Sequence, residues 1–341
     1  MTPLSVLDLA VVPTGGTSGQ ALRDSVALAQ HVERLGYRRF WVAEHHGMPG
    51  VASASPPVLL AAVAGATETI RVGSGGVMLP NHAPLVVAEQ FGTLEGLHPG
   101  RVDLGLGRAP GTDPVTAAAL RRTPGPLSVD DFPQQVLALQ AFFAGEHDGL
   151  LAVPAAGNAP QVWLLGSSGY SAQLAGLLGL PFAFAHHFSA ENTVPALALY
   201  RSTFRPSEAL PEPYAVVCVS VVCADDDEEA HRLALPGALS FLRLRSGRPG
   251  TFPSPEEAAA HPWSEHERAW AASRAAQQAV GGPATVRARL DALLAETAAD
   301  ELMVTTMVHD PADRLRSFEL VAGLADRADD GLVWRREDAA A

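Results

Sequence analysis

The sequence contains no lysine, so all 24 of its basic residues are arginines. Schiff-base aldolases, pyridoxal-phosphate enzymes and Walker-type phosphate loops all need a lysine amine at the active site. The absence of lysine therefore excludes these three classes. The use of arginine in its place is typical of a GC-rich genome and does not weaken the exclusion.

Charged residues are also scarce, at 18% of the 341 residues, whereas 47% are hydrophobic. This composition excludes wholesale disorder and supplies enough apolar side chains for a sizeable core. The formal net charge of −13 disfavours binding to nucleic acid or to an acidic membrane surface, because both carry negative charge. We therefore expect no nucleic-acid partner and no membrane partner.

Cysteine occurs twice, at Cys218 and Cys223, in an apolar run that is typical of a strand. Their odd spacing places the two thiols on opposite faces of that strand, so we predict that they do not pair. There is no disulfide framework, no basic segment before the first apolar run, and no apolar stretch long enough for a bilayer. These features favour a cytoplasmic protein.

Short apolar runs alternate with longer helical patterns along the whole chain. The predicted strands are residues 6–12, 40–43, 70–79, 102–107, 162–165, 182–185, 214–223 and 302–308. Eight strand-then-helix units imply parallel strands joined by right-handed crossovers, and eight is the number that closes a barrel. The alternative, an open doubly wound sheet, is disfavoured because Gly15-Gly16 after the first strand lacks the dinucleotide-binding spacing.

We therefore predict an α/β fold, a single (β/α)8 TIM-barrel domain over residues 1–328, with an insertion between strands seven and eight. The insertion covers about residues 225–300, and a segment that long is usually a lid or a binding element. The alternative is an inert peripheral insertion. Residues 329–341 are expected to form a flexible tail.

Catalytic residues of such barrels lie at the carboxyl ends of the strands. Glu44, His45 and His46 follow the second predicted strand, and at most one of the two imidazoles needs to face the barrel mouth. The alternative is a pair of loop histidines with ordinary hydrogen bonds. His186 and His187 follow the sixth strand, but no H-x-x-x-H or H-x-H spacing occurs, so we predict no metal site.

Ser74, Gly75 and Gly76 end the third predicted strand. Glycines inside a strand usually mark a bulge or the close approach of a ligand to the backbone, and a flat aromatic ring is one such ligand. Tight packing in the barrel wall is the alternative explanation.

Arg108 follows the fourth strand, and Gly166, Ser167, Ser168 and Ser171 follow the fifth, at the start of a helix. Free N–H groups and the helix dipole make such a turn a ready site for an anion. The turn alone is better explained as an ordinary serine N-cap. Together with Arg108 on the neighbouring strand, it predicts a phosphate site.

The runs FWVAEHH (40–46) and VGSGGVMLP (72–80) resemble the bacterial luciferase-like monooxygenase family, and 101–108 and 162–168 fit its fourth and fifth strands. The resemblance covers nearly the whole chain and is strongest over residues 1–113. It implies a barrel that binds FMN, or the deazaflavin F420, at the carboxyl ends of the strands. It also implies a homodimer, formed by the helices after strands two and three.

The resemblance implies that His45 lies beside the flavin, and we assign it the catalytic acid–base role, with Glu44 beside it. Gly75 and Gly76 match a pair that often carries a non-proline cis peptide against the flavin ring. His187 and Phe188 are expected to line the substrate side. The residues expected to bind the cofactor are Ser74, Gly75, Gly76, Arg108, Gly166, Ser167, Ser168 and Ser171.

Two positions depart from the luciferases. Their reactive cysteine on strand four corresponds to Gly107, and a second phosphate-binding arginine falls near Asp130. A light-emitting luciferase is therefore not expected. The leading hypothesis is a two-component monooxygenase that uses reduced FMN from a separate flavin reductase, and O2, to oxidise a small organic substrate. The alternatives are an F420-dependent hydride-transfer oxidoreductase and a non-catalytic flavin-binding protein.

Overall fold

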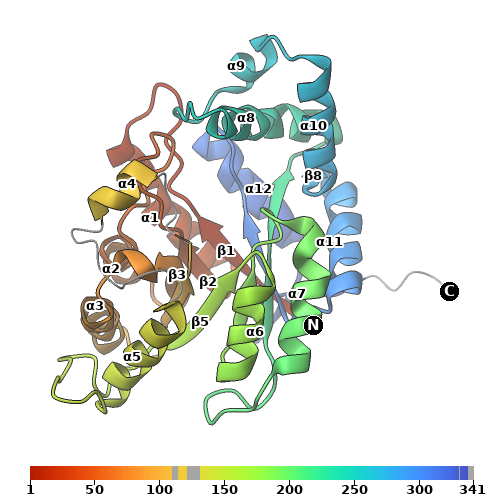
Figure 1. Ribbon diagram of the computed structural model, residues 1–341. Helices are drawn as coiled ribbons and strands as arrows, with labels where there is room; N and C mark the ends of the chain where they lie inside the picture. The colour runs from red at the N-terminus through yellow and green to blue at the C-terminus, as the bar shows by residue number, and fades with distance from the viewer. Residues whose placement is uncertain (110–113, 121–130, 330, 337–341) are drawn as a thin grey trace.

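Eight parallel strands close into a barrel in the computed structural model, which describes residues 1–109, 114–120, 131–329 and 331–336 (Figure 1). Around the ring, the strands are β1 (Thr2–Asp8), β2 (Arg39–Val42), β3 (Arg71–Met78), β4 (Val102–Gly107), β5 (Gln161–Gly166), β6 (Phe182–Phe184), β7 (Ala215–Cys223) and β9 (Glu301–Thr305). Each strand pairs in parallel with the next, and β9 closes the ring between β7 and β1. The predicted (β/α)8 barrel is confirmed.

Helices follow the strands and surround the barrel. They are α1 (Ser18–Leu35), α2 (Pro56–Ala66), α3 (Pro84–Leu97), α4 (Pro114–Leu120), α5 (Phe132–Ala144), α6 (Gly169–Leu178), α7 (Thr193–Thr203), α11 (Pro283–Thr297) and α12 (Pro311–Gly323), with short 3-10 turns at η1 (Leu79–Asn81) and η3 (Ala190–Asn192). Proline occupies the first turn of α2, α3, α5, α11 and α12, where its missing N–H costs no hydrogen bond.

Alternate residues of each strand face the barrel interior, and the others pack against the helices. Inside the barrel, the rings of Trp41 and Trp163 meet edge to face with their centroids 5.2 Å apart. Gly73 makes room for them, because a Cβ there would lie 2.7 Å from the Trp41 indole nitrogen. Cys218 belongs to this inner cluster and Cys223 to the outer one, and both are free thiols, as the odd spacing predicted.

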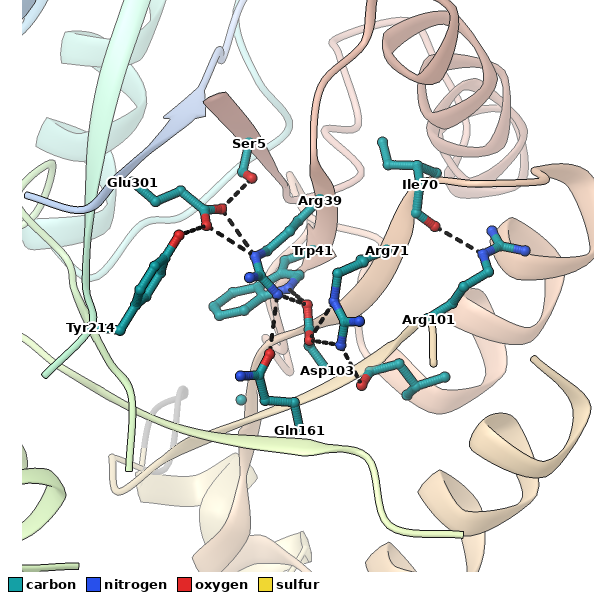
Figure 2. Close-up of polar contacts among 12 residues, drawn as sticks. Ser5, Arg39, Trp41, Ile70, Arg71, Arg101, Asp103, Gln161, Tyr214 and Glu301 are labelled. Atoms are coloured by element: carbon teal, nitrogen blue, oxygen red, sulfur yellow. Dashed lines mark hydrogen bonds and ion pairs between the residues drawn. The ribbon is translucent and has the colours of Figure 1, made fainter. Parts of the chain in front are cut away.

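A buried ionic network closes the amino-terminal end of the barrel (Figure 2). Arg39 donates to Asp103 at 2.8 Å and to Glu301 at 3.1 Å, and all three side chains are almost fully buried. Arg71 donates to Asp103, and Tyr214 donates to Glu301. Burial alone would raise the pKa of Asp103, but the two guanidinium groups outweigh burial and hold that pKa below its usual value.

The insertion between β7 and β9 contains α8 (Asp227–Arg245), α9 (Pro255–Ala260), α10 (Glu265–Ala276), β8 (Ala279–Gly281) and α11. Figure 1 shows α8, α9 and α10 gathered at one end of the molecule, and β8 pairs with the carboxyl end of β7. Phe252 exchanges two backbone hydrogen bonds with Val12 and Thr14 in the loop after β1, each 2.8 Å long. The inserted segment therefore reaches across the carboxyl end of the barrel, whereas α11 packs on the outside, against α7 and α12.

The carboxyl-terminal residues differ from the predicted flexible tail. Residues Gly331–Trp334 form β11, which pairs antiparallel with β1 and with β10 (Asp326–Ala328). Trp334 is 1% exposed and its indole N–H donates to Asp291 at 2.8 Å. The prediction of a frayed segment from Asp329 is therefore wrong for residues 331–334, because their apolar side chains are buried against the barrel. Across the described ranges, no helix combines the length and the apolar character needed to cross a membrane.

Candidate active site at the carboxyl end of the barrel

His45 lies in the loop after β2 and carries a buried imidazole nitrogen for which the described residues offer no hydrogen-bond partner. Its backbone N–H donates to the carbonyl oxygen of Ser53 at 2.9 Å, and this bond holds the loop. The unpaired ring nitrogen is Nδ1. Burial lowers the pKa of His45, His46 lowers it further, and Glu44 opposes them. The imidazole is therefore neutral at neutral pH and able to accept a proton or a hydrogen bond.

Glu44 is fully buried and joins the ends of β2 and β3. One carboxylate oxygen accepts hydrogen bonds from Nε2 of His46 and of His82, each at 2.8 Å, and the other accepts from the Met78 N–H at 3.0 Å. Burial would raise the pKa of Glu44, but the bonds from His82 and His46 outweigh burial and lower it. Glu44 therefore holds the histidine loop in place, and its expected catalytic role stays a prediction.

Sequence reasoning missed His82, whose only signal was its place just after the third strand. The ligand atoms of Glu44, His46 and His82 lie within 4.8 Å of one another, close enough to hold a metal ion. The two imidazole–carboxylate hydrogen bonds already account for this convergence. The absence of a metal site stays a prediction.

Gly75 and Gly76 form a stretch of bare backbone at the end of β3. The Gly75–Gly76 peptide is cis, as the family resemblance implies, and the pairing of β3 with β4 shifts register between Gly75 and Val77. A Cβ at Gly75 would lie 2.6 Å from a methyl carbon of Leu7, and one at Gly76 would lie 2.8 Å from the Gly105 oxygen. Tight packing in the barrel wall therefore accounts for glycine at both positions, and the approach of a ligand to this backbone stays a prediction.

Ser74 supports this stretch from behind. Its hydroxyl is fully buried, donates to the Gly105 carbonyl at 2.9 Å and accepts from the Gly105 N–H at 3.0 Å. Its hydroxyl is thus bonded to β4 in both directions, and the expected contact of Ser74 with a cofactor stays a prediction.

Arg108 and the amino terminus of α6 come together as predicted. The guanidinium carbon of Arg108 lies 4.2 Å from the ring centroid of Tyr170, in the first turn of α6. Ser168 is the N-cap of this helix, and its side chain makes no capping hydrogen bond. The serine is therefore not an ordinary side-chain N-cap. The N–H groups of the first turn of α6 lie near the guanidinium of Arg108, and this arrangement suits a bound anion.

Gly166 and Ser171 bring α6 close to the end of β5. A Cβ at Gly166 would lie 2.7 Å from the Ser171 Cβ, and Ser171 is buried, whereas Ser167 is half-buried. Gly107, at the position of the luciferase cysteine, lies against the side chain of Met78, whose sulfur would be 2.7 Å from a Cβ at this position. Asp130, at the position of a second phosphate-binding arginine, lies outside the described residues.

His187 and Phe188 follow β6 and face the insertion. His187 Nδ1 donates to the Cys218 carbonyl at 3.2 Å, and burial lowers the pKa of His187 to about 4, with further lowering from Arg274, His186 and His45. The next residue, Phe188, contacts Phe241 of α8, and Phe241 in turn contacts the guanidinium of Arg274, so the loop after β6 meets the inserted helices. Arg274, on α10, was missed by sequence reasoning because nothing in the sequence showed how the insertion folds over the barrel.

We expect His187 to make the stability of the protein depend on pH. Its pKa is about 4 in the folded state and about 6.5 when unfolded. Between these values the unfolded chain binds a proton that the folded chain does not. The free energy of unfolding therefore falls as pH is lowered through this window, by about 1.4 kcal/mol per pH unit from this group.

Urea unfolding of the parent and of His187→Gln at several pH values between 4 and 7 measures this effect. The variant should show the shallower dependence, while the same substitution at the exposed His266 should leave the slope unchanged. Equal slopes for His187→Gln and the parent would show that the imidazole is not held neutral by burial.

Comparison with known proteins gives a consistent assignment. A model of the family described as "Luciferase-like monooxygenase" matches residues 2–301. The chain is 51% identical to YvbT, an uncharacterized protein of Bacillus subtilis, with 94% of this chain and 96% of the relative covered. It is 48% identical to a luciferase-like monooxygenase of Escherichia coli (strain K12), with 93% and 95% covered. The crystal structure of apo-MsnO8 superposes with a TM-score of 0.88 at 38% identity, with 95% and 98% covered. The chain belongs to the luciferase-like monooxygenase family.

Proposed function

We propose that the protein is a flavin-dependent monooxygenase that uses reduced FMN and O2 to oxidise a small organic substrate. One observation supports this proposal: three complementary features lie together at one end of four adjacent parallel strands. They are the unpartnered imidazole of His45, the bare backbone of Gly75 and Gly76, and Arg108 beside the amino terminus of α6.

These residues fit the parts of FMN. Arg108, Ser168 and the first N–H groups of α6 would hold the phosphate, because they offer positive charge and unsatisfied donors. The glycine pair would accept the flat ring system against its backbone. When bound, the reduced flavin supplies the electrons that activate O2.

The protein's own residues would position and protect the reactants. His45, neutral and with its Nδ1 atom free of protein partners, can hold or accept a proton at that atom. Glu44 fixes the loop that carries His45. The inserted helices α8 and α10, which cover the mouth near His187 and Phe188, would exclude water from the reaction.

Coenzyme F420 is the alternative cofactor. The solved structures that share this fold include a 3,6-diketocamphane monooxygenase component from Pseudomonas putida in complex with FMN, with a TM-score of 0.70 at 20% identity. They also include an F420-dependent secondary alcohol dehydrogenase, with a TM-score of 0.68 at 15% identity. Titrating the pure protein with FMN, reduced FMN and F420 would decide between the two cofactors. A protein that binds flavin but never forms an oxygenated product would be a non-catalytic flavin-binding protein.

We further propose two partners, a separate flavin reductase and a second copy of the chain. The reductase is needed because the proposed reaction consumes reduced FMN. A homodimer through α2 and α3 is supported by large apolar side chains on the outside of these helices. Val58 is 69% exposed and Leu97 is 67% exposed.

Replacing Arg108 by alanine tests the phosphate site. We expect the affinity for FMN to fall by about 10-fold to 100-fold, the usual cost of a lost charge-assisted hydrogen bond. The affinity for riboflavin, which lacks the phosphate, should not change. Quenching of flavin fluorescence measures both constants, and Arg316→Ala on the exposed face of α12 is the matched control. An equal loss for FMN and riboflavin would assign Arg108 to the ring or to the fold, and not to the phosphate.

A further inference from the structure

A cavity of about 420 Å³ lies between the loop after β6 and the inserted helices α8 and α10. Three aromatic rings line it, from Phe188, Phe241 and Trp270, together with the guanidinium groups of Arg245 and Arg274. A serine and a glutamine complete the lining, and none of the described residues around this cavity is acidic. The cavity therefore has a positively charged lining, in a chain whose net charge is −13.

Arg274 is the centre of this cavity's charge. Its guanidinium carbon lies 4.0 Å from the ring centroid of Phe241, and Phe241 in turn stacks on Trp270 with centroids 5.9 Å apart. Burial lowers the pKa of Arg274, and no carboxylate of the described residues pairs with it to offset that effect. Among the described residues, the ring of Phe241 is the partner of this guanidinium.

The other buried arginines show what is missing at Arg274. Arg39 is bound to Asp103 and Glu301, and Arg314 is bound to Asp8. A partly desolvated cation is costly unless a negative charge lies close to it. An anion in the cavity would supply to Arg274 the partner that the protein supplies to the other two.

The cavity adjoins the candidate active site. Phe188, which lines the cavity, directly follows His187, and the pKa of His187 is affected by both Arg274 and His45. The ring of Phe188 also meets that of Phe241 edge to face, with centroids 6.4 Å apart. A molecule whose charged end meets Arg274 can therefore extend its body past Phe188 toward the two histidines.

We propose that this cavity binds the carboxylate end of an organic acid with an apolar body, and that the insertion thereby selects anionic substrates. Arg274 pairs with the carboxylate, because a guanidinium matches the two oxygens geometrically. Phe188, Phe241 and Trp270 pack against the apolar body. The assignment of this ligand as the substrate rests on the proposed monooxygenase function, whereas its binding does not.

Binding of matched acid and alcohol probes, measured by calorimetry without flavin, tests the proposal. We expect benzoate and hexanoate to bind at least about 10-fold more tightly than benzyl alcohol and hexanol, as a charge-assisted pair predicts. Arg274→Gln should abolish this preference for the acids. Arg268→Gln, an exposed position six residues earlier on α10 that lies outside this cavity, should preserve it.

Three outcomes would overturn the proposal. They are equal affinity for acids and alcohols, no binding of either acid, and an acid preference that survives in Arg274→Gln. Displacement of benzoate by inorganic phosphate or FMN at equal concentration would assign the cavity to a phosphate group, and would also overturn it. The direct titrations with acids and alcohols contain no flavin, so their result does not depend on FMN binding. The acid preference can fail while the Arg108 test succeeds, or the Arg108 test can fail while the acid preference is found, so the two proposals are judged separately.

Discussion

Replacing Arg39 by methionine should lower the free energy of unfolding by about 3–5 kcal/mol, the range observed when one partner of a buried ion pair is removed. Arg39 is 3% exposed and binds Asp103 and Glu301, which are both fully buried. Without Arg39, Asp103 keeps Arg71 and the Trp41 indole N–H. Glu301 keeps only the hydroxyls of Ser5 and Tyr214 and becomes a buried anion without a cation.

The pH dependence of this loss has a definite sign. An unpaired buried carboxylate has a raised pKa, so the folded variant binds a proton more readily than the unfolded chain does. The gap in stability between the parent and Arg39→Met should therefore narrow as the pH falls from 7 toward 4. Urea unfolding followed by circular dichroism at both pH values measures the gap.

Two further variants sharpen this test. Adding Glu301→Gln to Arg39→Met should recover part of the loss, because the amide carries no charge. Its oxygen can accept from one of the hydroxyls of Ser5 and Tyr214, and its NH2 group can donate to the other. Arg316→Met removes an arginine whose ion pair with Asp225 is exposed, and should cost less than about 1 kcal/mol. If Arg39→Met is no more destabilising than Arg316→Met, the buried network does not stabilise the barrel.

Replacing His45 by alanine should reduce product formation by about 100-fold to 10,000-fold, the usual contribution of a positioned acid–base group. His45 Nδ1 is buried without a partner, and burial keeps the imidazole neutral at neutral pH. The side chain does not bond to Glu44, so its loss leaves the contacts of Glu44 with His46, His82 and Met78 intact. The fold and the affinity for FMN should therefore change little.

Incorporation of 18O from labelled O2 into a panel of small organic acids, with reduced FMN supplied, measures this effect by mass spectrometry. Circular dichroism and an FMN titration on the same sample separate catalysis from folding and from binding. The exposed His266→Ala is the matched control and should behave as the parent does. Undiminished product from His45→Ala would remove the proposed catalytic role.

The barrel and the meeting of Arg108 with α6 followed from the sequence because both depend on local patterns. Hydrophobic periodicity marks each strand and helix, as the agreement of the predicted strand 102–107 with β4 shows. Once the strands are known to be parallel and consecutive, the residues after β4 and β5 must share one edge. Arg108 beside Tyr170 is the result.

The roles of Glu44 and Ser74 could not be obtained in the same way. Both lie at strand ends, where sequence reasoning placed them in the site, but the sequence does not say toward which neighbour a side chain turns. Glu44 turns to His82, which is 38 positions away, and Ser74 turns to Gly105, which is 31 positions away. Each polar group is buried and so must satisfy its hydrogen bonds within the protein, and the partners it finds are set by the tertiary structure.

The amino-acid sequence by itself determined the closed ring of strands, the glycine stretch and the cation at its rim, since these arise from short repeating patterns and the order of the strands. Only the tertiary structure decided which residues complete the site. The contact of Phe188 with Phe241, the bond of Glu44 with His82 and the pairing of β11 with β1 all join segments far apart in the chain. Such contacts depend on how the whole surface packs, and no local propensity encodes them.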